Sequence, residues 1–292
     1  MHKMHNTTAG RVFDVFNFIF LGLVGLVTVV PFLYIVAGSF ATESELATRP
    51  FFIIPETITT DAYRYIFSTD SVLRSLGVSV FVTVVGTFIS MILTLTMAYP
   101  LSRKTMVGRN FILNLVLFSM LFSGGMIPTY LLVKSLGLLD SLWSLILPLA
   151  INPFNLIIVK TFFQELPREL EDASKIDGCS EFQTFWKVML PLSKPVIATF
   201  TLFYAVFYWN DFFQALLYLT DTTKWPIQLL LQQLVMVANV GLGDMQEAML
   251  YEPPEESTKL AVIVVATVPI LIFYPFLQKH FAKGVMLGSV KG

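Results

Sequence analysis

One acidic side chain, Asp211, stands inside a long apolar stretch, directly after Trp209 and Asn210. If this stretch crosses a membrane, the acid is costly to insert and is expected to face a cavity. The three side chains together offer an aromatic face, an amide and a carboxylate, which suit a ligand rich in hydroxyl groups. The alternative is a Trp-Asn-Asp cap at the end of a helix near the membrane surface, and the residues favour neither interpretation.

Three further residues are weaker candidates for contact with a ligand: Tyr130, Asn152 and Asn155. The two asparagines stand on either side of Pro153. They also have a structural interpretation, in which their amides satisfy carbonyl groups that a proline kink would free.

Motifs for covalent or metal chemistry are missing from the sequence. It contains no Gly-x4-Gly-Lys-Ser/Thr phosphate-binding loop, no His-Glu-x-x-His and no Gly-x-Ser-x-Gly. The histidines are His2, His5 and His280, which are too scattered for a metal site, and the single cysteine excludes an intrachain disulfide. We therefore expect no catalytic residue, no metal and no bound cofactor, and any energy must come from a partner.

The composition places the chain in a membrane. Of its 292 residues 55% are hydrophobic and 13% charged, with a mean hydropathy of +0.72. Soluble domains carry about 25% charged residues, so a soluble enzyme is excluded. The net charge of −1 gives no reason to expect nucleic acid as a partner.

Long apolar runs predict an all-α membrane protein with six transmembrane helices in one domain, residues 1–292. Each run reaches the length of about 20 residues that a helix needs to cross the hydrocarbon core. A β-barrel would show alternating segments of about 10 residues instead. The predicted spans are 13–40, 73–101, 110–133, 141–163, 195–219 and 259–278.

The distribution of positive charge predicts that both termini lie in the cytoplasm. With this orientation most of the 19 Lys and Arg residues lie on the inner side. The first apolar run is too long for a cleaved signal peptide, so we expect it to be retained. In the outer loop 221–258, residues 226–237 are too short to span and predict either a re-entrant or interfacial helix that lines a cavity or a helix that caps the bundle.

The cytoplasmic loop 164–193 predicts two short helices. The first runs from Leu166 to Gly178, with Pro167 at its start and Gly178 as its stop. The second begins after Ser180, which forms a capping-box pattern with Gln183, and ends at Pro191. Both carry apolar residues at helical spacing. The pair is either a docking surface for a soluble partner or a tether that packs on the membrane face.

The segment Glu171-Asp-Ala-Ser-Lys-Ile-Asp-Gly178, followed by Val188-Met-Leu-Pro191, resembles the EAA signature. That signature belongs to the permease subunits of binding-protein-dependent ABC importers. Asp172 departs from it where the first Ala is usual, and Cys179 stands in place of another Ala.

Two other segments narrow the resemblance. Residues 276–292 are similar to the ending of carbohydrate permeases of the maltose type. Residues 123–130 and 209–211 resemble the subgroup that handles oligosaccharides derived from polysaccharides, which includes the alginate-importer permeases. The resemblance implies the type I importer fold in the bacterial cytoplasmic (inner) membrane, and alternating access for an oligosaccharide. The implied partners are a second homologous permease, two copies of an ABC ATPase subunit, an extracytoplasmic solute-binding protein and the lipid bilayer.

The resemblance also implies roles for individual residues. The first helix of the inner loop would be the coupling helix that contacts the ATPase, where a carboxylate can pair with an arginine. The coupling residues would be Glu171, Asp172, Ala173, Asp177, Gly178 and Phe182. A tail with Gly284, Gly288 and Lys291 would reach the ATPase dimer, although a frayed terminus is the structural alternative. ATP and Mg²⁺ would be held by the partner subunits.

The identity of the solute stays open at this stage. If the sugar is acidic, Asp211 would repel it, and Lys134 or Lys224 would have to contribute. The same importer class with a non-sugar solute is one alternative. An ATP-independent secondary transporter or channel is another, although a docking helix pair would then have no partner.

Overall fold

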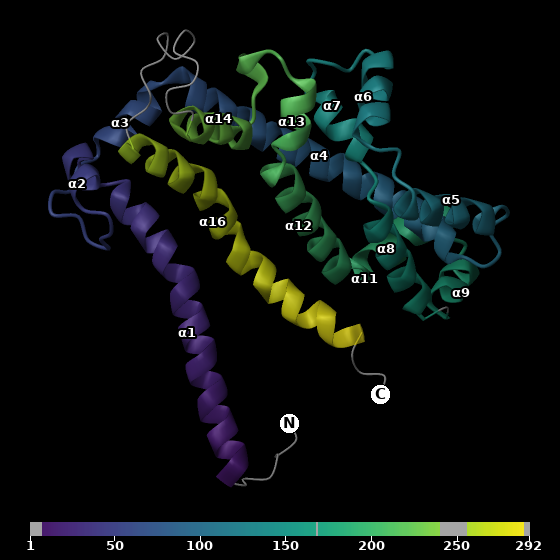
Figure 1. The fold of residues 1–292 in the computed structure, drawn as a ribbon. Coiled ribbons are helices and arrows are strands. Elements are labelled where there is room, and N and C mark those ends of the chain that lie inside the picture. Colours follow the sequence, from purple (N-terminus) through teal and green to yellow (C-terminus); the bar gives the residue numbers. More distant parts are fainter. Residues whose placement is uncertain (1–7, 168, 240–255, 289–292) are drawn as a thin grey trace. The chain divides into compact units, whose positions relative to one another are not determined.

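The structure, a computed structural model, describes residues 8–167, 169–239 and 256–288 (Figure 1). This part of the chain is built from helices joined by short connections and contains no strand, which confirms the all-α prediction. Two compact units are present. One comprises residues 1–69 and 234–267, and the other comprises residues 70–233 and 268–292.

The first unit begins with α1, Thr8–Gly38, which contains most of the first predicted span. Apolar side chains surround most of this helix, and most of them are exposed. This is expected of a helix that contacts lipid or another membrane protein. The short helices α2, Glu43–Thr48, and α3, Asp61–Ser68, follow. Ser39 and Tyr63 share a hydrogen bond of 2.8 Å, which ties the end of α1 to α3.

The long helix α16, Glu256–Gly288, starts in this unit and contains the sixth predicted span. The Glu43 carboxylate accepts hydrogen bonds from the backbone N–H groups of Glu256 and Ser257, at 3.1 and 3.3 Å. The first N–H groups of a helix have no partner inside it, and the positive end of the helix dipole favours an anion there. Glu43 thus holds the start of α16 against α2.

The second unit is organised around α4, Asp70–Ser102, the second predicted span. The helices α8, Pro153–Glu165, and α12, Lys194–Asn210, pack against it. Small residues of α4 permit this close approach, as is usual between membrane helices. Gly86 lies under the Tyr208 ring, while Ser90 and Thr94 form hydrogen bonds of 2.9 and 2.8 Å with the Tyr208 and Tyr204 hydroxyls.

The third predicted span, 110–133, is not one straight helix. It divides into α5, Arg109–Leu121, and α6, Met126–Ser135, with a bend of 120° between them. Gly125 has a φ of +85°, a conformation that glycine adopts without steric cost, and Phe122 is extended. The prediction of one straight helix failed because hydropathy depends on residue type and does not reveal a bend in the backbone.

The fourth and fifth predicted spans are also broken. The fourth comprises α7, Trp143–Ile146, the 3-10 helix η1, Leu147–Leu149, and α8, with a bend of 50° before Pro153. The fifth contains α12, which ends at Asn210, and α13, Phe213–Tyr218. Asp211 therefore lies between two helices, so the prediction that it stands inside a helix was wrong.

After α13 come the 3-10 helix η3, Thr222–Lys224, and α14, Ile227–Asn239. The predicted short helix at 226–237 is thus present. Its first residues are buried, and the backbone N–H of Ile227 donates to Ser79 Oγ of α4 at 2.8 Å.

Among the described residues, α1 and α4 are each long and apolar enough to cross a membrane alone. Three bent pairs reach the same length and apolarity if each pair forms one span: α5 with α6, α7–η1 with α8, and the helical segment 181–192 with α12. The predicted count of six spans and the orientation of the termini stay predictions.

Candidate functional site

The first helix of the loop 164–193, which the sequence places in the cytoplasm by prediction, is α9, Glu169–Ile176. Acidic residues occupy its first turn and Lys175 its last, which complements the helix dipole. The turn just past its end contains Gly178, whose φ of +78° lets the Cys179 N–H donate to the Ser174 carbonyl at 2.9 Å. The predicted stop is confirmed. The predicted start is too early, because Leu166 precedes a proline and is extended.

The second helix begins with the predicted capping box. Ser180 Oγ accepts from the Gln183 N–H, and Gln183 Oε1 accepts from the Ser180 N–H. The segment continues as α10, Glu181–Thr184, a π-helical turn η2, Phe185–Met189, and α11, Leu190–Leu192. It thus passes through Pro191 instead of ending there. The wide turn lies directly before this proline, which lacks the N–H of the regular helical ladder.

Several polar side chains of the two helices lie on their inner side, and several large apolar side chains lie on their outer side. Glu171 and Ser174 of α9 are buried, and Ser174 shares a hydrogen bond of 2.8 Å with the buried Thr184 of α10. Ile176 is 87% exposed and Phe182 is 70% exposed, and the ring of Trp186 lies 6.1 Å from that of Phe182. Of the predicted apolar stripe, Phe185 and Met189 are buried in the core, while Ile176, Phe182 and Trp186 form an exposed apolar surface in this chain. Such a surface is typical of a protein interface.

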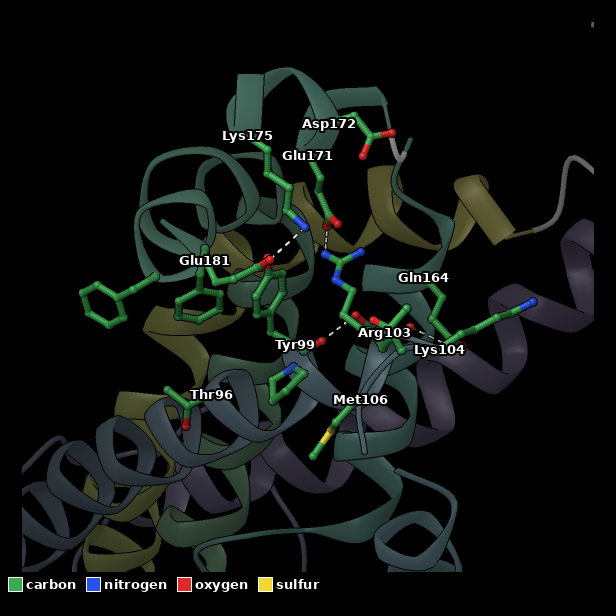
Figure 2. A pocket seen from close by; sticks show the side chains of 15 residues that line it. Thr96, Tyr99, Arg103, Lys104, Met106, Gln164, Glu171, Asp172, Lys175 and Glu181 are labelled. Atoms are coloured by element: carbon green, nitrogen blue, oxygen red, sulfur yellow. Dashed lines mark hydrogen bonds and ion pairs between the residues drawn. The ribbon is translucent and has the colours of Figure 1, made fainter. Parts of the chain in front are cut away.

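A cavity of about 900 Å³ lies between this helix pair and the Ser102 end of α4 (Figure 2). Its wall combines polar, charged and aromatic groups, from Thr96, Tyr99, Pro100, Ser102, Arg103, Lys104, Thr105, Met106, Gln164, Glu171, Asp172, Lys175, Glu181, Phe182 and Phe185. Most of the charged side chains in this wall form ion pairs with one another.

The inner pair joins Glu171 to Arg103, which directly follows α4. The Arg103 guanidinium also lies 4.6 Å from the centre of the Tyr99 ring, within the range of a cation–π interaction. The outer pair joins Lys175 to Glu181 at 2.8 Å, and this hydrogen bond raises the pKa of Lys175. Figure 2 shows both pairs side by side.

The predicted coupling residues lie on this loop, and their side chains point in two different directions. Glu171 faces its own chain, while the other side chains face outward, with Gly178 in the turn between the helices. The exposed members are Asp172, Ala173, Asp177 and Phe182. Sequence reasoning missed Arg103 and Tyr99. The available signal was the Arg103–Lys104 pair at the end of a predicted span, which does not reveal a partner far along the chain.

The predicted ligand residues at the end of α12 have separate environments. Trp209 is buried, and the exposed Asn210 donates its side-chain amide to the Val206 carbonyl at 2.8 Å. Asp211 Oδ1 accepts from the Gln214 N–H at 3.3 Å, which satisfies one N–H at the start of α13. Aspartate is favoured in front of helices for this reason. Asp211 thus caps the start of α13, whereas the predicted cap was at the end of the preceding helix.

The other candidates also have structural partners. Asn152 caps α8, because its side chain accepts from the Asn155 N–H at 3.1 Å, and its own N–H donates to the Tyr204 hydroxyl. Asn152 thus satisfies an N–H group rather than the carbonyl that the sequence suggested. Tyr130 of α6 stacks on Tyr218 of α13, with ring centres 6.2 Å apart.

The two lysines considered for an acidic sugar differ in their surroundings. Lys224 donates to the Asp140 carbonyl at 2.8 Å and pairs with the Asp140 and Asp221 carboxylates at 3.4 and 3.3 Å. Backbone donation from Asp221 lowers the pKa of Asp140, so this carboxylate keeps its negative charge beside Lys224. Lys134 of α6 is exposed.

The C-terminal tail is helical where the structure describes it. Gly284 and Gly288 lie in the last turns of α16, and Lys291 lies outside the described residues. The tail of 284–292 is therefore an extension of the last helix up to Gly288.

Comparison with known proteins agrees with this architecture. Residues 3–287 match the family described as the binding-protein-dependent transport system inner membrane component. The protein LplC of Bacillus subtilis is 66% identical over 295 residues, covering 100% of this chain and 99% of LplC. The polygalacturonan/rhamnogalacturonan transport system permease protein YtcP of the same organism is 59% identical, covering 97% of this chain and 99% of YtcP.

A solved structure is also similar. It is the crystal structure of a bacterial ABC transporter involved in the import of the acidic polysaccharide alginate. The match has a TM-score of 0.87 at 31% identity and covers 96% of this chain and 100% of the other. Fold, loop and sequence thus agree, and the chain belongs to the family of binding-protein-dependent inner membrane transport components, the permease subunits of ABC importers.

Proposed function

We propose that this chain is one of two permease subunits of an importer in the bacterial cytoplasmic membrane. The importer carries oligosaccharides derived from acidic polysaccharides by alternating access. A solute-binding protein delivers the sugar to the outer loops, and two ATPase subunits supply the energy. ATP and Mg²⁺ are held by those subunits, and the permease itself performs no covalent chemistry.

The outward apolar surface of the α9–α10 pair is the observation that supports a cytoplasmic partner best. Ile176 and Phe182 lie on the segment between two predicted spans, and the chain's own core does not cover them. Burying one such side chain contributes about 1.5–3 kcal/mol. A cleft in the ATPase that accepts α9 would cover these side chains, with Asp177 and Gly178 at its edge. Closure of the ATPase pair on ATP would then move this helix.

The relatives support an acidic sugar as the solute. One is named for polygalacturonan and rhamnogalacturonan transport, and the similar solved structure imports alginate. Polygalacturonan and alginate are polymers of uronic acids, so their fragments carry carboxylates. Lys134 is the exposed cation among the residues considered for such a ligand, whereas Lys224 is held in an ion cluster. The groups at 209–211, Tyr130 and the Asn152–Asn155 pair stay candidates for hydroxyl contact along the path.

The proposal is tested by assembling the chain with the second permease, ATPase and binding protein encoded near its gene. The binding-protein-stimulated ATPase rate is then measured with oligogalacturonates, alginate oligosaccharides and neutral maltooligosaccharides. We expect stimulation by acidic oligosaccharides. Stimulation by the neutral sugars alone would contradict the proposed substrate, and the absence of any co-purifying ATPase would contradict the proposed partnership.

A further inference from the structure

Two cations, Arg109 and Lys160, stand where the apolar parts of two helices end. Arg109 directly precedes the uncharged run 110–133, and Lys160 directly follows the uncharged run 141–159. Runs of this length and apolarity are the parts that enter the hydrocarbon core, so the two cations mark its border with the lipid headgroups. Long basic side chains at such a border extend their charge towards the headgroups.

The end of α4 brings these two cations together. Arg109, the first residue of α5, donates from Nε to the Leu101 carbonyl at 2.9 Å. Gln164 of α8 donates from Nε2 to the Ser102 carbonyl at 3.2 Å. Lys160 stands one turn before Gln164 on α8 and therefore shares its face. The helices α5 and α8 also pack against each other, and Lys160 lies within reach of the Arg109 charge.

Neither cation has a carboxylate partner among the described residues, where the ion pairs involve other basic side chains. Nη1 of Arg109 donates to the Asn110 side-chain oxygen at 3.2 Å, which is a neutral acceptor. Both cations are partly buried, so the repulsion between them is screened less than at an open surface. Two like charges in this situation favour an anion as a third partner.

We propose that Arg109 and Lys160 bind the phosphate group of an anionic phospholipid at this border of the membrane. In the described part of the chain nothing accepts from Nη2 of Arg109, because its hydrogen bonds leave from Nε and Nη1. A guanidinium suits the oxygens of a phosphate, and the Lys160 ammonium adds a compact second charge. The inference does not depend on which solute the importer carries.

The surroundings of the pair favour a lipid over a dissolved anion. Phe111 and Ile158, which lie two positions further into the apolar runs, have exposed side chains that an acyl chain can contact. Basic pockets between transmembrane helices at the level of the headgroups bind anionic lipids. A phosphate held here would relieve the repulsion between the two cations and so stabilise the contact of α5 with α8.

The test measures lipid binding to the assembled transporter in neutral detergent with phosphatidylcholine. Phosphatidylglycerol is titrated in, and native mass spectrometry counts the lipid molecules that stay bound. We expect Arg109→Gln and Lys160→Gln each to weaken the retention of one phosphatidylglycerol molecule about fivefold, and the double variant to weaken it about 25-fold. Lys160→Arg, which keeps the charge, should retain the affinity.

Lys194→Gln is the matched control. Lys194 begins α12 and directly precedes the uncharged run 195–210, and its side chain is exposed. The variant thus removes a cation from the same kind of border without changing the pair, and phosphatidylglycerol should bind as tightly as before.

Lys160→Glu provides a second measurement, because it gives Arg109 an anion from within the chain. In phosphatidylcholine this variant should raise the thermal midpoint by about 2–4 °C, the shift expected from one recovered charge interaction. Phosphatidylglycerol should raise the midpoint of the unchanged protein by a similar amount and leave that of Lys160→Glu unchanged.

Three results would overturn the proposal. The double variant could bind phosphatidylglycerol as tightly as the unchanged protein. Inorganic phosphate could raise the midpoint as much as phosphatidylglycerol does, which would make the ligand a dissolved anion. The double variant could lose its ATPase subunits while lipid binding stays the same, which would assign the pair to the ATPase interface. None of these readouts requires sugar uptake, so failure of the proposed function is seen separately.

Discussion

At the residue scale, Gly178 gives the sharpest test of the loop as a docking site. Its φ is +78°, and no heavy atom lies within 4 Å of an added Cβ. Aspartate tolerates this left-handed conformation better than most residues. Gly178→Asp should therefore leave the chain folded, yet place a side chain where the ATPase must approach. We expect ATP hydrolysis that no longer drives uptake.

Gly178→Asn serves as the comparison for charge. It fits the left-handed turn at least as well and adds a side chain of nearly the same size. Both variants should uncouple if the partner closes against this turn. Normal sugar-stimulated ATPase activity and transport in reconstituted vesicles bearing Gly178→Asp would show that the turn is not at the interface.

The sequence reveals some site residues and conceals others for a physical reason. Gly178, Ser180 and Gln183 form local patterns whose partners lie within a few positions, so they can be recognised from spacing. The Arg103–Glu171 pair joins residues far apart in the chain, and packing of the spans creates it. Asp211 was likewise predicted inside a helix, because hydropathy alone does not show that α12 ends one residue earlier.

At the element scale, the contact between α4 and α12 depends on the absence of a side chain at Gly86. A Cβ there would lie 2.8 Å from ring carbons of Tyr208, which is held by its hydrogen bond to Ser90. Overpacking of this kind costs about 1–3 kcal/mol. Gly86→Ala should lower the thermal midpoint of the purified permease in detergent.

Gly77→Ala is the control on the same helix, because nothing lies within 4 Å of its added Cβ. In a helix the alanine is the better residue, so this variant should be neutral or slightly stabilising, by up to about 1 kcal/mol. Equal midpoints for the two variants would mean that α4 and α12 do not pack as described.

The outward face of the loop helices makes a separate prediction. Phe182→Ala removes an exposed ring from the surface that is proposed to meet the ATPase. It should weaken ATPase association about tenfold or more, the equivalent of burying one apolar side chain. Association is measured by titrating purified ATPase onto the reconstituted permease. Val107→Ala, at a position that is 95% exposed in the turn after α4, should leave the affinity unchanged.

If Phe182→Ala binds the ATPase as tightly as the Val107 control does, this face is not part of the interface.

The sequence predicted both loop helices and their apolar residues, but not the side of the helix on which each residue lies. An apolar stripe on a helix normally faces the core of its own chain. Here Phe185 and Met189 face the core, whereas Ile176, Phe182 and Trp186 face outward. The inner side also holds polar contacts, such as those between Ser174 and Thr184 and between Glu171 and Arg103.

At the scale of the whole molecule, composition and the spacing of apolar runs predicted a helical membrane protein correctly. The bends are what they could not predict. Apolarity measures transfer into lipid and is the same for a straight and a broken helix. The breaks before Met126 and Pro153 follow from backbone conformation, and the strongest local signals there were Gly124, Gly125 and the proline itself.

The C-terminal end supplies a prediction at this scale. α16 continues as a helix to Gly288, beyond the length that a span requires. We expect deletion of residues 284–292 to reduce ATPase stimulation while leaving insertion into the membrane intact, because the family resemblance implies that this tail reaches the ATPase subunits. Binding-protein-stimulated hydrolysis in vesicles is the readout. Full activity of the truncated chain would refute a role for the tail.

The most direct test of the central claim is uptake into proteoliposomes. The reconstituted transporter, with binding protein outside and ATP inside, is given a labelled acidic oligosaccharide. We predict accumulation that requires ATP and binding protein, competes with oligogalacturonate or alginate fragments, and is lost in Gly178→Asp. Accumulation without ATP, or with a neutral sugar in place of the acidic one, would contradict the account.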